Sequence, residues 1–163
     1  MADHDEVLAV VSASAGRRAL GIGSLWVLAF VLIYIALFES PAFGWRVFLI
    51  AMGAGSFYMA DKMRRATAVQ LELTYTELRD SSGNCLAKIA DIKSIDRGVF
   101  AFKPSNGFLL ALTQPGPRVW QPGLWWRIGR RIGVGGMTPG SQTKPMAEII
   151  SAMIAERELR NGD

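Results

Sequence analysis

The residues best suited to chemistry stand together in the last third of the chain, where tryptophan and arginine are interleaved. The stretch from position 118 to 131, RVWQPGLWWRIGRR, is called here the Trp-Arg segment, and its candidate contact residues are Arg118, Trp120, Trp125, Trp126, Arg127, Arg130 and Arg131. Tryptophan rings favour the boundary between lipid and water, and guanidinium groups pair with phosphates. Trp and Arg also dominate the energetics of protein interfaces. The segment therefore indicates contact with lipid headgroups or with a protein partner.

The charge around the Trp-Arg segment is one-sided. Between Arg97 and Lys144 the chain carries seven basic residues and no Asp or Glu, so its net charge of +4 divides into +7 here and −3 elsewhere. Near an anionic leaflet each basic residue contributes about 1 kcal/mol to binding. The alternative interpretation is that strand alternation buries one of Trp125 and Trp126 while the arginines are merely solvated. Basic and aromatic stretches also bind nucleic acid, but no nucleic-acid-binding module is recognisable, so we expect no such partner.

The sequence contains few residues suited to catalysis or metal binding. The chain has one cysteine, Cys85, and one histidine, His4, which lies in an acidic N-terminal stretch. A single thiol provides neither a disulfide framework nor a Cys-rich metal site, and Cys85 has no histidine to activate it. The carboxylates of the second half lie in predicted turns or on solvent-facing strand positions. We therefore predict no catalytic residue, no metal site, no cofactor and no enzymatic activity, with an uncharacterised enzyme as the third hypothesis for function.

The elements that must position the Trp-Arg segment begin with two apolar runs. Residues 19–38 are 20 in a row without a charge, and as a helix they span about 30 Å, the thickness of a bilayer's hydrocarbon core. A second uncharged run of 14 residues covers 47–60 and is long enough to cross if Arg46 extends to the headgroups and Trp45 anchors the interface. We predict a polar N-terminal tail over 1–18 and a transmembrane helical hairpin over 19–61, with helices at about 19–38 and 45–60. A re-entrant or interfacial second helix is the alternative.

The flanks and the small residues of the hairpin indicate its orientation and its packing. Basic residues gather at the ends nearest the rest of the chain, and only Arg46 lies in the connecting loop; the five at the ends are Arg17, Arg18, Lys62, Arg64 and Arg65. Positive charge is retained on the cytoplasmic side, so we expect both termini in the cytoplasm and the chain in the inner (cytoplasmic) membrane. Ala51 and Gly55 have the spacing that lets two helices approach closely. We assign them to packing within the hairpin, with an oligomerisation or partner face as the alternative.

The remainder of the chain, residues 66–163, changes character to short strands. A chain of 163 residues leaves room for one such domain besides the hairpin. Residues 69–74 alternate apolar and polar, Ser81–Asn84 is a Gly-containing turn, and a second hairpin is predicted between 99–103 and 108–113. The last segment has the spacing of an amphipathic helix with Pro145 in its first turn; its apolar positions are Met146, Ile149, Ile150, Met153 and Ile154. We predict an α+β domain of about six or seven antiparallel strands capped by a C-terminal amphipathic helix.

The run from Leu71 to Ile95, LELTYTELRDSSGNCLAKIADIKSI, resembles the opening of bacterial pleckstrin-homology-like (PH-like) domains. The similar features are a strand ending in a Leu-Thr pair, a Leu like Leu78, a Gly-containing turn and an Asp-Ile pair like Asp91-Ile92. Several such families carry a two-helix membrane hairpin directly before the domain. The resemblance implies an antiparallel β-barrel capped by the C-terminal helix and no enzymatic activity. These families are largely of unassigned function, and none of their binding residues maps onto this chain.

Together these patterns predict a non-catalytic, membrane-anchored adaptor or accessory subunit of a membrane protein complex, with its domain on the cytoplasmic face. The expected partners are the membrane itself and either another membrane protein or a second copy of this chain. Anionic phospholipid is the further ligand that the basic charge favours. The alternative function is an anionic-lipid-sensing membrane protein that uses the same basic surface.

Overall fold

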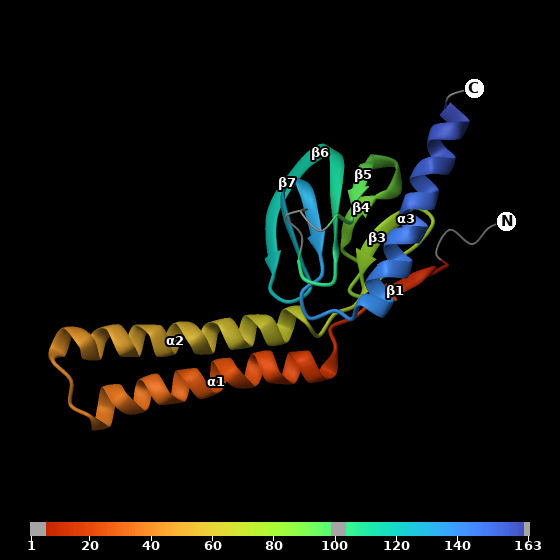
Figure 1. Cartoon of the computed structure of the whole chain (residues 1–163). Helices are drawn as coiled ribbons and strands as arrows, with labels where there is room; N and C mark the ends of the chain where they lie inside the picture. Colours follow the sequence, from red (N-terminus) through yellow and green to blue (C-terminus); the bar gives the residue numbers. More distant parts are fainter. Residues whose placement is uncertain (1–5, 99–103, 162–163) are drawn as a thin grey trace.

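The computed structural model of the protein describes residues 6–98 and 104–161. A helical hairpin projects from a β-rich domain, and the first and last described elements, β1 and α3, both belong to the domain (Figure 1). In chain order the elements are β1 (Ala9–Val11), α1 (Ala15–Phe38), α2 (Phe43–Ala66), β2 (Leu71–Leu73), β3 (Glu77–Asp80), β4 (Cys85–Lys88), the 3-10 turn η1 (Ile89–Asp91), β5 (Ile92–Asp96), β6 (Phe108–Gln121), β7 (Trp125–Val134) and α3 (Gly140–Asn161).

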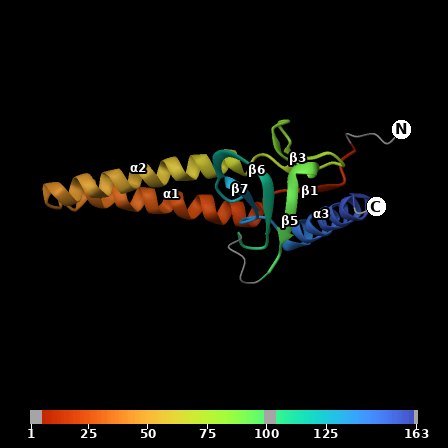
Figure 2. The ribbon, with the colours of Figure 1, turned by 90° about the horizontal axis from the view of Figure 1, so that it is seen from above.

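The hairpin consists of two antiparallel helices of 24 residues each, about 36 Å long, which run side by side away from the domain (Figure 2). Small residues form the seam: Gly53, Ser56 and Ala60 of α2 are buried. A Cβ atom at Gly53 would lie 2.8 Å from Ile33 Cγ1 and 3.3 Å from the Ala29 carbonyl oxygen. Close approach of the two backbones therefore depends on Gly53.

The seam does not use the pair predicted from the sequence. Ala51 and Gly55 are both exposed, and a Cβ atom at Gly55 would meet nothing within 4 Å. The reason is helical geometry, because a residue two positions from Gly53 is rotated about 200° around the axis. The assignment of Ala51 and Gly55 to packing within the hairpin was wrong.

Of the described residues, only α1 forms a helix that is long and apolar enough to cross a membrane. Just 11% of its most apolar stretch is buried inside the protein, whereas the core helix of a soluble domain would be mostly covered. In α2 the uncharged run is confined to 47–60 by Arg46 and Asp61. The structure thus contains one candidate span, α1, with α2 packed against it.

The described strands form two antiparallel sheets, one of four strands in the order β1-β2-β3-β4 and one of three in the order β5-β6-β7. The two sheets are not closed into a barrel, so that part of the predicted fold was wrong. In the middle of β6, Pro115 and Pro117 cannot donate hydrogen bonds, and the register with β7 shifts on both sides of Gly116. Between β7 and β4 a side chain, Arg127, makes the connection instead of a ladder.

β1 lies before the helical hairpin yet pairs with β2, which follows it. Ala9 is opposite Leu73, Val11 is opposite Leu71, and Val11 is fully buried in the core. The helical hairpin is therefore inserted between two paired strands. Residues 9–11 fall within the predicted polar tail, because a three-residue strand whose partner is 60 positions away leaves no local pattern.

Other elements follow the sequence more closely. The predicted turn joins β3 to β4, with Gly83 at φ +85° and the Asp80 carboxylate accepting from the backbone of Ser82 and Asn84. The C-terminal helix is present but begins at Gly140, five residues before Pro145, and buries Met146. The predicted strand 99–103 lies outside the described residues, and β6 pairs with β5 and β7. Both sheets and α3 enclose one core, which includes Leu71, Leu78, Ile92, Phe108, Leu110, Ile132 and Ile150.

Candidate functional site

The Trp-Arg segment spans the turn 122–124 of the β6–β7 hairpin and continues along most of β7. The register places Trp120 opposite Trp126 and Gln121 opposite Trp125. Because side chains alternate across a strand, the first pair projects outward and the second inward. Trp125 is only 8% exposed and belongs to the core. The alternation interpretation thus holds for Trp125, which is a structural residue.

The two outward tryptophans are held in different ways. Trp126 lies over Gly133, where any Cβ atom would collide with its indole ring. Trp120 is 49% exposed, and its ring stands 4.8 Å from Lys62 Nζ on α2. This cation–π contact brings the β6–β7 hairpin to the helix end where the uncharged run of α2 has just stopped.

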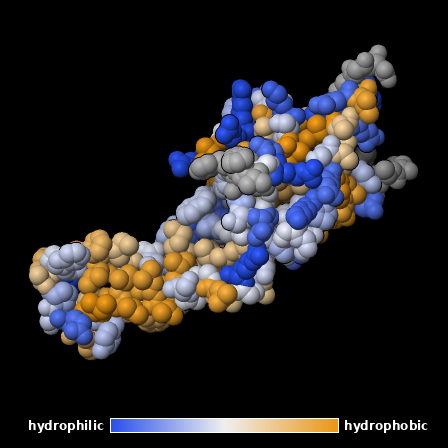
Figure 3. All heavy atoms as spheres, viewed as in Figure 1, coloured by the Kyte–Doolittle hydropathy of each residue, from blue (hydrophilic) through white to orange (hydrophobic). Residues whose placement is uncertain are grey.

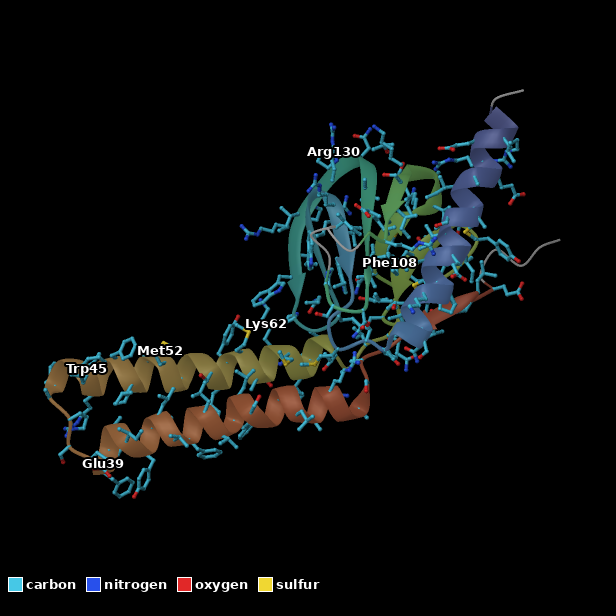
Figure 4. All side chains as sticks on the ribbon, in the orientation of Figure 1. Glu39, Trp45, Met52, Lys62, Phe108 and Arg130 are labelled. Carbon is cyan, nitrogen blue, oxygen red and sulfur yellow. The ribbon has the colours of Figure 1, made fainter. Side chains whose placement is uncertain are left out.

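The four arginines of the segment divide into one structural residue and three exposed ones. Arg127 turns across Gly116, and its Nη1 donates to the Leu86 carbonyl at 3.0 Å, so it joins the second sheet to the edge of the first. Arg118, Arg130 and Arg131 are exposed. Figure 4 shows Arg130 at the end of the β6–β7 hairpin farther from Lys62. The structure therefore does not bring the four arginines together at one site.

What the structure does bring together is an outer face on the β6–β7 hairpin, defined here as Arg118, Trp120, Trp126 and Ile128. These residues line an open hollow of about 660 Å³. Ile128 is 54% exposed and was missed from the sequence, although it follows Trp126 by two positions and so projects from the same face of β7. Lys62 was also missed as a site residue, because its place in the sequence indicated only the orientation of the helical hairpin and not its contact with Trp120.

A junction beside the outer face ties the β6–β7 turn to both helices. The Met137 backbone N–H donates to the Gly123 carbonyl at 2.9 Å, and the Met137 carbonyl accepts from Ser14 N–H at 2.8 Å, just before α1. The Met137 side chain packs against Gly21 of α1 and against Gly123. Thr67, at the end of α2, lies 3.1 Å from the Cβ position of Gly123. The outer face therefore has a set orientation relative to the helical hairpin.

Among the groups that could support catalysis, Glu72 and Cys85 are held in structural contacts. No group of three or more His, Cys, Asp or Glu residues that could hold a metal ion occurs in the described part of the chain. Glu72 pairs with Arg79 at 3.2 Å. Partial burial, followed by a hydrogen bond with Glu77, raises the pKa of the Cys85 thiol to about 11, which leaves it protonated and weakly nucleophilic at neutral pH.

Comparison with known proteins adds no relative: no family model, curated protein or solved structure matches the chain. The structural class can therefore be stated only from the protein's own geometry. It is a two-sheet domain with a C-terminal helix, in which an apolar helical hairpin is inserted between two paired strands.

Proposed function

We propose that the protein is a membrane-anchored, non-catalytic adaptor or accessory subunit of a membrane protein complex. The observation that carries this proposal is the apolar surface of the helical hairpin (Figure 3). Large side chains are exposed along both helices, among them Leu20, Trp26, Val27, Leu28, Phe30, Val31, Leu37, Phe38, Phe43, Trp45, Val47, Phe48, Ile50 and Met52. Soluble monomers rarely expose so large a continuous apolar surface, and a bilayer is the solvent in which it is stable.

The full proposal is that both helices cross the bilayer, and the geometry of α2 supports it. The uncharged run of α2 lies between Arg46 and Asp61, and Lys62 is the first basic residue after it. The 16 residue steps from Arg46 to Lys62 correspond to about 24 Å of helix. Long basic side chains that extend to the headgroups add the remaining length needed for a hydrocarbon core of about 30 Å. Exposed Trp45 and Tyr58 lie near the two ends of this run, where aromatic residues anchor membrane helices.

The proposed orientation puts the domain in the cytoplasm, against the inner membrane of a bacterium. β1 and α3 are both on the domain side of the hairpin (Figure 1), so both termini would share one compartment. The basic residues of the helix ends are on that side as well, with Arg46 alone at the far tip. Kinship with PH-like domains remains a proposal, supported by the order of antiparallel strands followed by a C-terminal helix.

An adaptor is favoured over a lipid sensor because the domain is held at several points. Besides the contacts of Met137, Arg17 Nη1 donates to the Thr138 carbonyl at 3.0 Å. A sensor would need two orientations or conformations that the lipid selects between, whereas contacts at several points favour a fixed orientation of the domain. The proposed absence of catalysis is supported by the pairing of Glu72 with Arg79 and by the protonated thiol of Cys85.

Membrane insertion is tested by alkaline carbonate extraction of membranes that contain the full chain. We expect the wild type to stay in the membrane fraction, and the double substitution Val27→Asp with Val31→Asp to release it, because two charges in the apolar surface oppose insertion. The matched control is Leu159→Asp, which changes an apolar residue that is 76% exposed on α3, and it should remain in the membrane. Release of the wild type would contradict the proposal.

The adaptor role is tested by purification of the wild type in a mild detergent. We expect a particle of defined stoichiometry that contains a second membrane protein, with a mass that light scattering resolves from monomer and dimer of this chain. A particle that contains only this chain would contradict the adaptor role while leaving insertion intact.

A further inference from the structure

We infer that the outer face of the β6–β7 hairpin, together with Lys62, binds the headgroups of anionic phospholipids in the leaflet next to the domain. The inference rests on the proposed insertion of the helical hairpin. It adds a ligand class and a site that the adaptor role alone does not require.

The depth of Lys62 relative to the membrane supports this site. The uncharged run of α2 ends at Ala60, and Lys62 is the first basic residue after it. In a membrane-inserted hairpin Lys62 is therefore at headgroup level, because lysine side chains extend to the interface. Trp120 holds its ring 4.8 Å from Lys62 Nζ. The contact places the exposed tryptophan of the outer face at the same level as the headgroups.

The chemistry of the outer face also suits an anionic phospholipid. Trp120, Trp126 and Ile128 give the hollow an apolar lining, and exposed Arg118 adds a basic residue to that lining. A phospholipid headgroup with the glycerol and upper acyl chain has the same combination of a phosphate and an apolar body. No Asp or Glu occurs between positions 97 and 144, so nothing in that range opposes an anionic headgroup. Arginine suits phosphate because its donors form a planar fork.

The outer face has a set orientation relative to the helical hairpin, which favours binding. The Met137 junction joins the β6–β7 turn to the beginning of α1 and the end of α2. Insertion of the hairpin therefore presents the outer face to the leaflet without any further ordering of the domain, which removes an entropic cost of binding. Arg127 is outside the site because its guanidinium group is committed to the Leu86 carbonyl.

The test uses the full chain in proteoliposomes of phosphatidylcholine and phosphatidylglycerol at one overall composition. A nitroxide quencher on the acyl chain, near its top for the label at position 128 and near its end for the label at position 27, is carried on phosphatidylglycerol in one preparation and on phosphatidylcholine in the other. In a Cys85→Ser background, a fluorophore is attached at Ile128→Cys on the outer face, or at Val27→Cys on α1 to report insertion. We expect the label at position 128 to be quenched several-fold more strongly by phosphatidylglycerol.

The charge dependence of this preference is tested by Arg118→Gln, which should lower it about fivefold, the factor that corresponds to about 1 kcal/mol per basic residue near an anionic surface. Lys62→Gln should act in the same direction. The matched control is Arg160→Gln, an exposed arginine at the end of α3, and it should leave the preference unchanged.

The outcomes separate this inference from the proposed function. Three results at position 128 would overturn the inference while quenching at position 27 shows that insertion stands. They are no quenching, equal quenching by both lipids, and a preference for phosphatidylglycerol that survives Arg118→Gln and Lys62→Gln. If position 27 is not quenched either, the membrane anchor itself is wrong.

Discussion

The helical hairpin and the β-rich domain use the same kinds of apolar residue in opposite arrangements. In the hairpin the interior is made of Gly53, Ser56 and Ala60 while Leu, Val and Phe project outward. In the domain the interior is made of residues such as Leu78 and Leu110, both fully buried. The difference is the one expected of the proposed insertion, because apolar bulk gives no advantage between helices surrounded by lipid, where close backbone packing associates them instead.

The largest expected effect comes from removing apolar bulk from the domain. Leu110→Ala should lower the free energy of unfolding by about 2–5 kcal/mol, the usual cost of a buried leucine with its cavity. Leu37→Ala, at a position that is 59% exposed in α1, should change it by less than about 0.5 kcal/mol. Thermal unfolding in detergent, followed by the fluorescence of the five tryptophans, among them buried Trp125, measures both. Equal losses would remove the contrast between the two regions.

The second-largest expected effect is a loss of stability in the helical hairpin on substitution of Gly53. Gly53→Val should destabilise the hairpin by about 1–3 kcal/mol, because its Cβ atom would lie 2.8 Å from Ile33 and 3.3 Å from a backbone oxygen. Gly55→Val is the matched control, since nothing lies within 4 Å of its Cβ position. The measurement is the melting of helical circular dichroism in detergent. A larger effect at Gly55 would show that the seam has been assigned to the wrong face.

A third effect compares two arginines of the Trp-Arg segment. Arg127→Leu should cost about 1.5–3 kcal/mol, because it leaves the Leu86 carbonyl without its charged donor. Arg130→Leu, at an exposed position, should stay within about 0.5 kcal/mol. The same unfolding measurement distinguishes them, and similar values for the two variants would contradict the structural role of Arg127.

The smallest effect concerns reactivity rather than stability. With the pKa of Cys85 raised from 9.0 to about 11, the thiolate fraction at pH 8 is about 100-fold lower than in the unfolded chain. Alkylation of the native protein should therefore be slower by a similar factor. A raised thiol pKa means that the native state holds its proton more tightly, so stability falls as pH rises between 9 and 11. Equally fast alkylation of native and denatured protein would contradict the effect of burial and Glu77.

Local patterns were sufficient for the elements that depend on neighbouring residues. The uncharged run in α1, the turn at Gly83 and the apolar face of α3 around Met146 and Ile150 could all be read from the sequence, because charge, turn chemistry and helical spacing are local properties. Even there the boundaries moved, as α1 begins at Ala15 and α3 at Gly140.

Features that depend on distant pairing could not be predicted. β1 is recognisable only through its partner β2, 60 positions later. The seam through Gly53 and not through Ala51 and Gly55 depends on how α1 lies against α2. The role of Arg127 depends on Leu86, in the other sheet. Composition identified the Trp-Arg segment, but only the fold divides its residues between the core, a connection between sheets and an exposed face.

The most direct test of the central claim, a membrane-inserted hairpin with its domain at the surface, is thiol labelling of the full chain in sealed vesicles. In a Cys85→Ser background, single cysteines replace Val31 in the middle of α1 and Leu159 on α3, and a membrane-impermeant maleimide is added from the domain side. We expect rapid labelling at position 159, and labelling at position 31 only after the membrane is dissolved and the protein denatured. Equal labelling of both positions in intact vesicles would contradict the claim.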